Sequence, residues 1–169
     1  MYSFGERQKF RQWWLWLLLV VICAVELYFF IYHNGGRYTV YRALGVIVAL
    51  VVCIFFFFIR LETNIDGTGI QYRFFPVQLS YRKIDWSEVA EVYVRKYSPL
   101  GEYGGWGIRM SAGKNGWAYN IAGNMGLQIV KRDGKKLLIG TQKPDELNAL
   151  LQRLAGDKII ACNITTERY

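Results

Sequence analysis

The chain has 169 residues, of which 53% are hydrophobic, and its formal net charge is +8. Its three cysteines include no CxxC pair, which argues against a zinc ribbon, a dithiol redox motif and a disulfide framework. The basic excess fits anionic lipid headgroups better than nucleic acid, because no basic cluster is interleaved with a recognised nucleic-acid module. A solvated basic surface is the alternative.

Two apolar runs occupy the first third of the chain. Residues 13–32 and 43–59 are runs of 20 and 17 residues. A hydrocarbon core of about 30 Å is crossed by roughly 17–25 helical residues, so residues 1–60 predict a transmembrane helical hairpin. The first run exceeds the apolar core of a signal peptide and no small-residue cleavage site follows it, so we expect a retained anchor.

The orientation of the hairpin is predicted from the basic residues beside the two runs. Arg7, Lys9 and Arg11 precede the first run, and the loop holds Arg37 and Arg42. Because Lys and Arg favour the cytoplasmic side and the C-terminal region is also basic, we expect both termini in the cytoplasm.

Glu26 is the one ionisable residue inside the predicted spans. A charge near the centre of a bilayer costs about 2.5–3.5 kcal/mol on insertion scales, so such a residue suggests a function. The alternative is that Glu26 is protonated or reaches toward Arg37 or Arg42 at the loop. The second span offers no polar partner for an ion pathway.

A mainly-β region with turn signals begins at residue 61. Residues 61–65 and 70–74 flank the turn sequence Asp66-Gly67-Thr68-Gly69, which predicts a hairpin. Further strands are predicted in meander order, about seven in all, over residues 81–84, 91–97, 106–110, 117–121, 126–132 and 135–141. Eight glycines between Gly101 and Gly126 fit tight turns better than a phosphate-binding loop, whose spacing is not matched.

One amphipathic helix is predicted to cap this region. Pro144 begins it, and Leu147, Leu150, Leu151 and Leu154 form one apolar stripe at helical spacing. The expected helix covers residues 144–154, the β domain covers 61–155, and residues 156–169 form a C-terminal tail.

Three segments resemble small bacterial membrane proteins that carry a pleckstrin-homology-like (PH-like) domain after two membrane spans. These are residues 84–89 (IDWSEV), 103–109 (YGGWGIR) and 138–147 (LIGTQKPDEL). The resemblance implies a partly open barrel of about seven antiparallel strands capped by the last helix, located at the bacterial cytoplasmic (inner) membrane. It carries over no enzyme activity.

Two groups of candidate binding residues follow from this interpretation. PH domains that bind phosphoinositides use basic residues in the first hairpin loop, but residues 66–69 contain no Lys or Arg. Generic contact with anionic lipid stays open for basic residues elsewhere in the domain: Arg60, Arg82, Lys83, Arg95 and Lys96. Large aromatic residues in the glycine-rich stretch predict either core packing or a surface for a protein partner: Tyr103, Trp106, Trp117 and Tyr119.

Catalytic chemistry is not predicted. The only histidine, His33, lies between the two apolar runs, so no His-based catalytic or metal site can form in the β domain. We expect no enzyme activity, cofactor, metal or small-molecule substrate. The predicted function is a membrane-anchored interaction or scaffold module for anionic lipid, another membrane protein or a second copy of the chain. The alternative is a small sensor or transport-complex subunit that uses Glu26.

Overall fold

The computed structural model describes residues 2–32, 38–111, 113, 115–157 and 162–164. The chain divides into two compact units. One is Phe10–Ile59, and the other combines Met1–Lys9 with Arg60–Tyr169.

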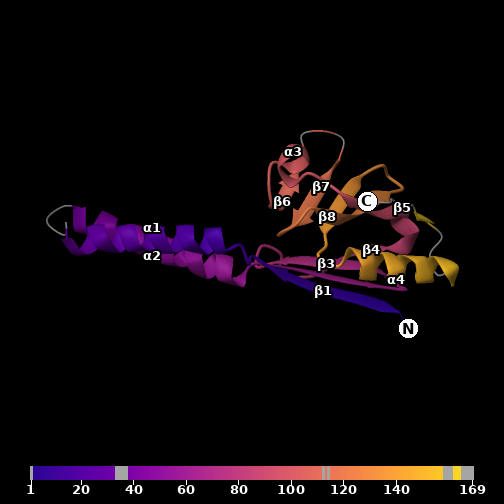
Figure 1. The fold of residues 1–169 in the computed structure, drawn as a ribbon, viewed down its shortest axis with the longest axis horizontal. Coiled ribbons are helices and arrows are strands. Elements are labelled where there is room, and N and C mark those ends of the chain that lie inside the picture. Colours follow the sequence, from indigo (N-terminus) through magenta and orange to yellow (C-terminus); the bar gives the residue numbers. More distant parts are fainter. Residues whose placement is uncertain (1, 33–37, 112, 114, 158–161, 165–169) are drawn as a thin grey trace. The chain divides into compact units, whose positions relative to one another are not determined.

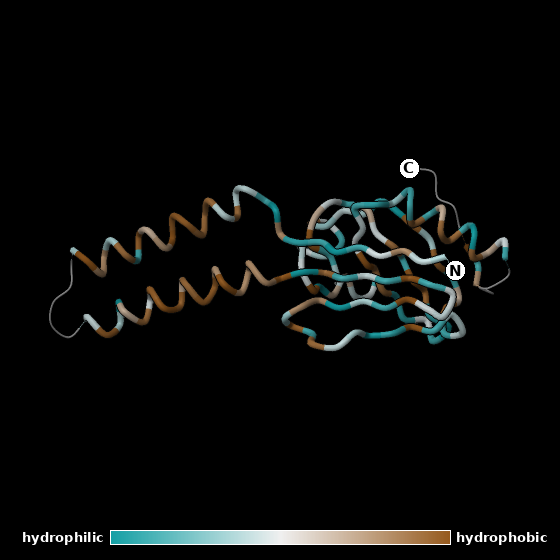
Figure 2. The backbone as a smooth tube through the Cα atoms, turned by 90° about the horizontal axis from the view of Figure 1, so that it is seen from below, coloured by the Kyte–Doolittle hydropathy of each residue, from teal (hydrophilic) through white to brown (hydrophobic). Residues whose placement is uncertain are grey.

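The first unit contains two long apolar helices, α1 (Trp13–Tyr32) and α2 (Thr39–Phe58). Both are long and apolar enough to cross a membrane, and most of their side chains lie on the outside of the unit. Figure 2 shows hydrophobic residues along nearly the whole length of both helices. The span predicted over 13–32 matches α1, whereas α2 begins four residues earlier than residue 43.

The two helices contact each other along their length. Near one end the rings of Trp16 and Phe57 pack edge to face with centroids 6.5 Å apart. Further along, the sulfur atoms of Cys23 and Cys53 approach to 3.4 Å. The predicted hairpin of helices is therefore present.

The first sheet of the second unit has the strand order β1-β2-β3-β4, and each neighbouring pair is antiparallel. Its strands are β1 (Ser3–Lys9), β2 (Arg60–Asp66), β3 (Gly69–Phe75) and β4 (Arg82–Asp85). The predicted β2–β3 hairpin is confirmed. Its turn is held by the Asp66 carboxylate, which accepts hydrogen bonds from the backbone N–H groups of Thr68 at 2.7 Å and Gly69 at 3.2 Å.

Strand β1 was not among the predicted elements. The sequence places it in the basic flank of the helical hairpin, but in the structure it pairs with β2 from Ser3 opposite Asp66 to Lys9 opposite Arg60. Its side chains alternate in the manner of a half-buried strand, with Phe4 and Gln8 buried and the intervening Arg7 exposed. The N-terminal segment thus belongs to the β domain.

Side-chain hydrogen bonds fasten β1 to the rest of the β domain. The buried Gln8 amide donates to the carbonyl oxygen of Gly140 at 2.7 Å. The Glu6 carboxylate accepts from the Thr141 hydroxyl at 2.7 Å and from the backbone N–H of Gln142 at 2.8 Å. These contacts link the chain before the apolar helices to the segment that leads into the last helix.

The second sheet has the order β10-β5-β8-β9-β7-β6. Its strands are β5 (Val89–Lys96), β6 (Gly107–Met110), β7 (Trp117–Asn120), β8 (Met125–Lys131), β9 (Lys136–Gly140) and β10 (Asn163–Ile164). Figure 1 shows the two sheets facing each other, and buried aliphatic side chains from both fill the space between them. A 3-10 helix, η2 (Trp86–Glu88), connects β4 to β5.

The predicted all-antiparallel meander is wrong for this sheet. β5 pairs with β8 across a long intervening segment, and the β7–β9 and β5–β10 pairs are parallel. Turn residues identify hairpins between consecutive strands, whereas the order of distant strands depends on how their apolar faces pack. The meander order holds locally, since the predicted strands β8 and β9 form an antiparallel hairpin across Asp133-Gly134, and the predicted strands β6 and β7 also pair antiparallel.

Two helices complete the β domain. The amphipathic helix α4 (Pro144–Gly156) buries the predicted leucine stripe and contacts β1, β5 and β10. The short helix α3 (Pro99–Tyr103) was not predicted, because its segment opens the glycine-rich stretch. Ser98 caps it, since its hydroxyl accepts from the Gly101 N–H at 3.1 Å. Within the predicted tail, Asn163–Ile164 forms β10, and residues 158–161 and 165–169 lie outside the described part of the chain.

Candidate functional site

A groove of about 520 Å³ opens between β3, the β3–β4 connection and β4 on one side and β6 to β9 on the other. Its volume lies within the range of about 300–1,000 Å³ that small-molecule sites occupy. The residues that line it are Tyr72, Val77, Gln78, Arg82, Ile108, Trp117, Tyr119, Lys131, Lys135, Lys136 and Leu137. The lining thus combines apolar and aromatic side chains with four cations and contains no carboxylate.

Two tyrosines form part of the aromatic lining. The rings of Tyr72 and Tyr119 pack at 62° with centroids 5.0 Å apart, and both side chains are buried. The Tyr119 hydroxyl accepts hydrogen bonds from the Gln78 amide at 3.3 Å and from the Arg82 guanidinium at 3.4 Å. Burial raises the pKa of Tyr72, so this phenol stays neutral at physiological pH.

The four cations differ in how far their charge is compensated. Lys131 lies 3.1 Å from Glu88, and Lys135 lies 2.9 Å from Asp133. Within the described ranges of the chain, no ion pair involves Arg82 or Lys136. Arg82 is therefore the cation that faces the groove without an acidic partner among the described residues, and the groove is electropositive. Lys136 alternates with Leu137 along β9, so its side chain lies on the other face of the sheet.

The structure brings together three of the residues that the sequence singled out. Arg82, a predicted lipid contact, and the predicted partner residues Trp117 and Tyr119 all line the groove. Trp117 leaves about half of its surface exposed (48%), as a ligand contact requires.

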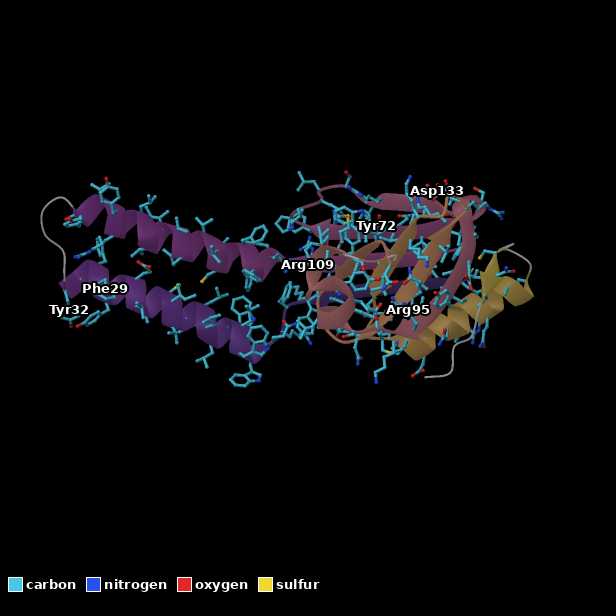
Figure 3. All side chains as sticks on the ribbon, turned by 90° about the horizontal axis from the view of Figure 1, so that it is seen from above. Phe29, Tyr32, Tyr72, Arg95, Arg109 and Asp133 are labelled. Carbon is cyan, nitrogen blue, oxygen red and sulfur yellow. The ribbon has the colours of Figure 1, made fainter. Side chains whose placement is uncertain are left out.

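The remaining predicted lipid contacts lie elsewhere. Arg60 lies on the face of the first sheet opposite Tyr72, Lys83 pairs with Asp85 at 2.7 Å, and Lys96 is exposed at the end of β5. Arg95 is mostly buried against Glu102, with Nη2 and Oε2 2.7 Å apart. Figure 3 shows Arg95 on the other side of the β domain from the labelled Tyr72 and Asp133.

The other two predicted aromatic residues, Tyr103 and Trp106, do not line the groove. Tyr103 is buried and packs edge to face against Tyr97 at 5.9 Å. Burial raises the pKa of Tyr97 to about 12, although a hydrogen bond from Asn120 opposes the shift. Trp106 donates its indole N–H to the carbonyl oxygen of Gly123 at 3.1 Å. The core interpretation therefore holds for Tyr103, and Trp106 fixes a loop.

Glu62 is the centre of an arginine cluster on the face of the first sheet opposite the groove. Glu62 is 3% exposed, and its carboxylate lies against the guanidinium groups of Arg7, Arg60 and Arg73. The Tyr81 hydroxyl also donates to it at 2.6 Å. Burial alone would raise the pKa of Glu62, but the hydrogen bonds from Tyr81 and Arg73 and the charges of Arg73 and Arg7 lower it to about 2.

This arginine cluster explains why Arg60 is not a simple surface cation. Besides its contact with Glu62 at 2.8 Å, its guanidinium carbon lies 4.4 Å from the centroid of the Phe75 ring. The cluster holds the beginning of β2, directly after the second apolar helix in the chain, to β1 and β3.

Glu26 lies at the contact between the two apolar helices. A Cβ atom built on Gly45 would lie 2.7 Å from its carboxylate oxygen, so the glycine provides the space that Glu26 occupies. A cavity of about 450 Å³ lies here, lined by both helices. Of the two arginines considered as partners, Arg37 lies outside the described residues, and Arg42 donates to the carbonyl oxygen of Phe29 at 3.5 Å.

The sequence-based search missed Tyr72, Gln78 and the three lysines of the groove. Lys131, Lys135 and Lys136 flank the Asp133-Gly134 turn, and a basic hairpin of this kind is a usable signal. His33 lies outside the described residues. In the part of the chain that the structure describes, no group of three or more His, Cys, Asp or Glu is placed to hold a metal ion.

No protein-family model matches this sequence, and no curated protein matches it. The class that the fold and the groove define is a mainly-β domain joined to two apolar helices.

Proposed function

We propose that this chain is a non-catalytic, membrane-anchored interaction module. In this proposal α1 and α2 form a transmembrane hairpin in a bacterial cytoplasmic membrane, and the PH-like β domain stands at its cytoplasmic surface. The groove lined by Arg82, Trp117 and Tyr119 is the binding site for a partner that carries negative charge. The anchor raises the effective concentration of the domain near membrane-bound partners.

The observation that carries the proposal is the pairing of β1 with β2. β1 precedes the first apolar helix, β2 follows the second, and the two strands pair along seven residues. Both ends of the helical hairpin therefore continue into adjacent strands of one sheet. This connection supports the proposed topology, in which the hairpin enters and leaves the membrane on the same side and the β domain lies next to that surface.

Labelling of Cys162 in intact cells tests the placement of the domain. We expect membrane pellets to retain the protein after alkaline carbonate extraction, and Cys162 to react with a maleimide only when the reagent crosses the membrane. Burial raises the pKa of the Cys162 thiol, so the labelling reaction is carried out at a mildly alkaline pH. A denatured sample gives the signal for full labelling. A Cys162→Ser variant measures background from Cys23 and Cys53. Release by carbonate, or labelling of Cys162 by an impermeant maleimide, contradicts the proposal.

A second candidate function rests on the position of Glu26 against Gly45. A carboxylate in a cavity between two apolar helices is the feature expected of a small sensor or transport subunit. Replacement Glu26→Gln keeps the shape and removes the ionisable group. For an anchor, we expect this variant to match the wild type in membrane insertion, in oligomeric state and in proton flux across proteoliposomes. A flux in the wild type that Glu26→Gln abolishes would support the sensor or transport function instead.

A further inference from the structure

The connection between β3 and β4, residues 76–81, has the properties of a membrane contact. We propose that this β3–β4 connection inserts its apolar side chains into the headgroup layer of an anionic bilayer leaflet, as a membrane contact additional to the helical hairpin. The inference rests on the proposed function, because the hairpin must span the membrane, and goes beyond it by assigning a lipid-contacting loop to the β domain. It uses contacts within the β domain and the continuity of the chain alone.

The β3–β4 connection concentrates the exposed apolar surface of the β domain. Three of its six residues expose large hydrophobic side chains: Val77 at 57%, Leu79 at 74% and Tyr81 at 41%. The other exposed large hydrophobic side chains among the described residues of this domain are distributed over the N-terminus, α3 and the β6–β7 pair: Tyr2, Leu100, Met110 and Trp117. Single exposed apolar residues need no explanation, whereas a group of them marks an interaction site.

Hydrogen bonds to β3 hold the connection in shape. The backbone N–H of Gln78 donates to the carbonyl oxygen of Phe74 at 2.8 Å, and the Gln78 side-chain oxygen accepts from the Phe74 N–H at 3.3 Å. The Arg73 guanidinium donates to the carbonyl oxygen of Leu79 at 3.1 Å. Because these backbone groups are paired within the domain, the apolar side chains can enter a lipid layer without carrying them there unpaired.

The strand register places the connection near the points where the chain passes to and from the apolar helices. Lys9, Arg60 and Phe75 lie side by side on β1, β2 and β3. Lys9 is the last residue before the helical unit, and Arg60 is the first residue after it. Strands lie about 4.8 Å apart and a residue spans at most about 3.6 Å, so the Cα atom of Val77 lies within about 12 Å of that of Arg60.

The charges around the connection fit an anionic headgroup layer. No Asp or Glu occurs in residues 67–84. Arg82, which directly follows the connection, is exposed and donates to the neutral Tyr119 hydroxyl. On the other face of the sheet, the arginine cluster brings three guanidinium groups to the single carboxylate of Glu62 and so carries net positive charge. Basic residues beside an apolar segment are attracted to anionic lipids, which favours a lipid leaflet as the occupant of this surface.

Fluorophore depth measurements on the full-length chain in proteoliposomes test the insertion. The vesicles contain phosphatidylethanolamine and phosphatidylglycerol, with a spin label near the top of the acyl chain of a tracer lipid. A single cysteine, Leu79→Cys or Ser87→Cys, carries a nitrobenzoxadiazole label in a background with serine at the three native cysteine positions. Ser87 is the control because it is exposed and follows β4 at Asp85, which lies opposite Gly69 at the other end of β3.

The two labels should report different surroundings. Interfacial apolar side chains reach about 5–10 Å into the boundary between headgroups and acyl chains, so we expect the spin-labelled lipid to quench residue 79 at least about threefold more than residue 87. Aqueous iodide should show the reverse order. Equal lipid quenching at the two positions, or stronger iodide quenching at residue 79, would overturn the proposal. Protection of residue 79 from iodide without lipid quenching would also overturn it, since that result indicates a protein partner such as a second copy of the chain.

A charge added to the connection gives an independent test. With the label on Val77→Cys, we expect Leu79→Asp to reduce lipid quenching at least about threefold, because a carboxylate is costly to move out of water. Ser87→Asp adds the same charge at the far end of the sheet and should leave the quenching within about 1.5-fold of the unmodified value. Thermal melts show whether both variants are folded. Unchanged quenching in a folded Leu79→Asp variant would contradict the proposal, and the comparison of residues 79 and 87 decides it if that variant does not fold.

The result can be separated from that of the proposed function. If carbonate extraction and Cys162 labelling give the expected results while residue 79 stays in water, the assignment of the β3–β4 connection fails and the membrane-anchored module stands. If carbonate releases the protein, the membrane-anchored module fails and this inference fails with it.

Discussion

Removing β1 lowers the free energy of unfolding of the β domain by about 4 kcal/mol or more. Phe4 is 6% exposed, and burying a phenylalanine side chain contributes about 1.5–3 kcal/mol. The hydrogen bonds of Gln8 and Glu6 to the Gly140–Gln142 segment add about 1 kcal/mol each. Loss of β1 also exposes the edge of β2, which favours aggregation.

The loss of stability is measured by comparing two shortened proteins that lack the apolar helices. One contains residues 60–169 alone. In the other, called the linked domain below, an Asn-Gly dipeptide joins residues 1–9 to residues 60–169. Lys9 lies directly opposite Arg60 in the β1–β2 pair, so a two-residue turn closes these strands as a hairpin. Urea unfolding should give one cooperative transition for the linked domain and a much lower midpoint or aggregation for residues 60–169. Equal midpoints would show that β1 does not belong to the fold.

Replacing Glu62 by glutamine lowers the stability of the linked domain at pH 7 by about 3 kcal/mol. The carboxylate has a pKa of about 2 in the folded state against an ordinary value of 4.5. Because the folded-state pKa is the lower one, the ionised group stabilises the protein above pH 4.5, and this contribution is lost as the pH falls from there toward 2. Removal of the charge also leaves Arg7, Arg60 and Arg73 without their shared partner.

The check is the urea midpoint of the linked domain as a function of pH. The wild type should lose stability more steeply than Glu62→Gln as the solution is acidified below pH 5, roughly the upper limit of this titration. Glu146→Gln is the matched control, since it makes the same change at an exposed carboxylate on α4 that pairs with Lys143. We expect this control to follow the wild type within about 0.5 kcal/mol, as surface pairs contribute little. Parallel acid profiles for the wild type and Glu62→Gln would contradict the described cluster.

Local patterns in the sequence were sufficient for the elements with strong periodicity. The apolar run of α1, the leucine stripe of α4 and the Asp66–Gly69 turn each form the predicted structure. Each is specified by residues close together in the chain. β1 lacks such a signal, because Phe4 and Gln8 are the buried positions of a short charged strand. It forms a strand only because it packs against β2 and α4. Those contacts join residues that the whole helical hairpin separates along the sequence.

The candidate site depends on the same kind of distant contact. Arg82, Trp117 and Tyr119 were selected by residue type, but the sequence assigned Arg82 to lipid contact and the aromatic residues to either core packing or a protein partner. The structure places all three in one groove, because β4 and β7 lie in different sheets that face each other. Leu137 enters the site only through the parallel β7–β9 pair, where it lies opposite Trp117, and turn chemistry does not indicate this arrangement.

The most direct test of the account asks whether β1 pairs with β2 in the full-length protein in native membranes. Gly5 lies opposite Asn64, and Asn64 in turn lies opposite Gln71 on β3. In a background with serine at the three native cysteine positions, we expect Gly5→Cys with Asn64→Cys to form an intramolecular disulfide on mild oxidation, read as loss of maleimide labelling. Gly5→Cys with Gln71→Cys should stay reduced, because a second strand spacing of about 4.8 Å puts its Cα atoms beyond the reach of a disulfide. Cross-linking of the first pair alone is the predicted result. No cross-link in the first pair, or equal cross-linking in both, would contradict a β domain closed by the strand that precedes the hairpin.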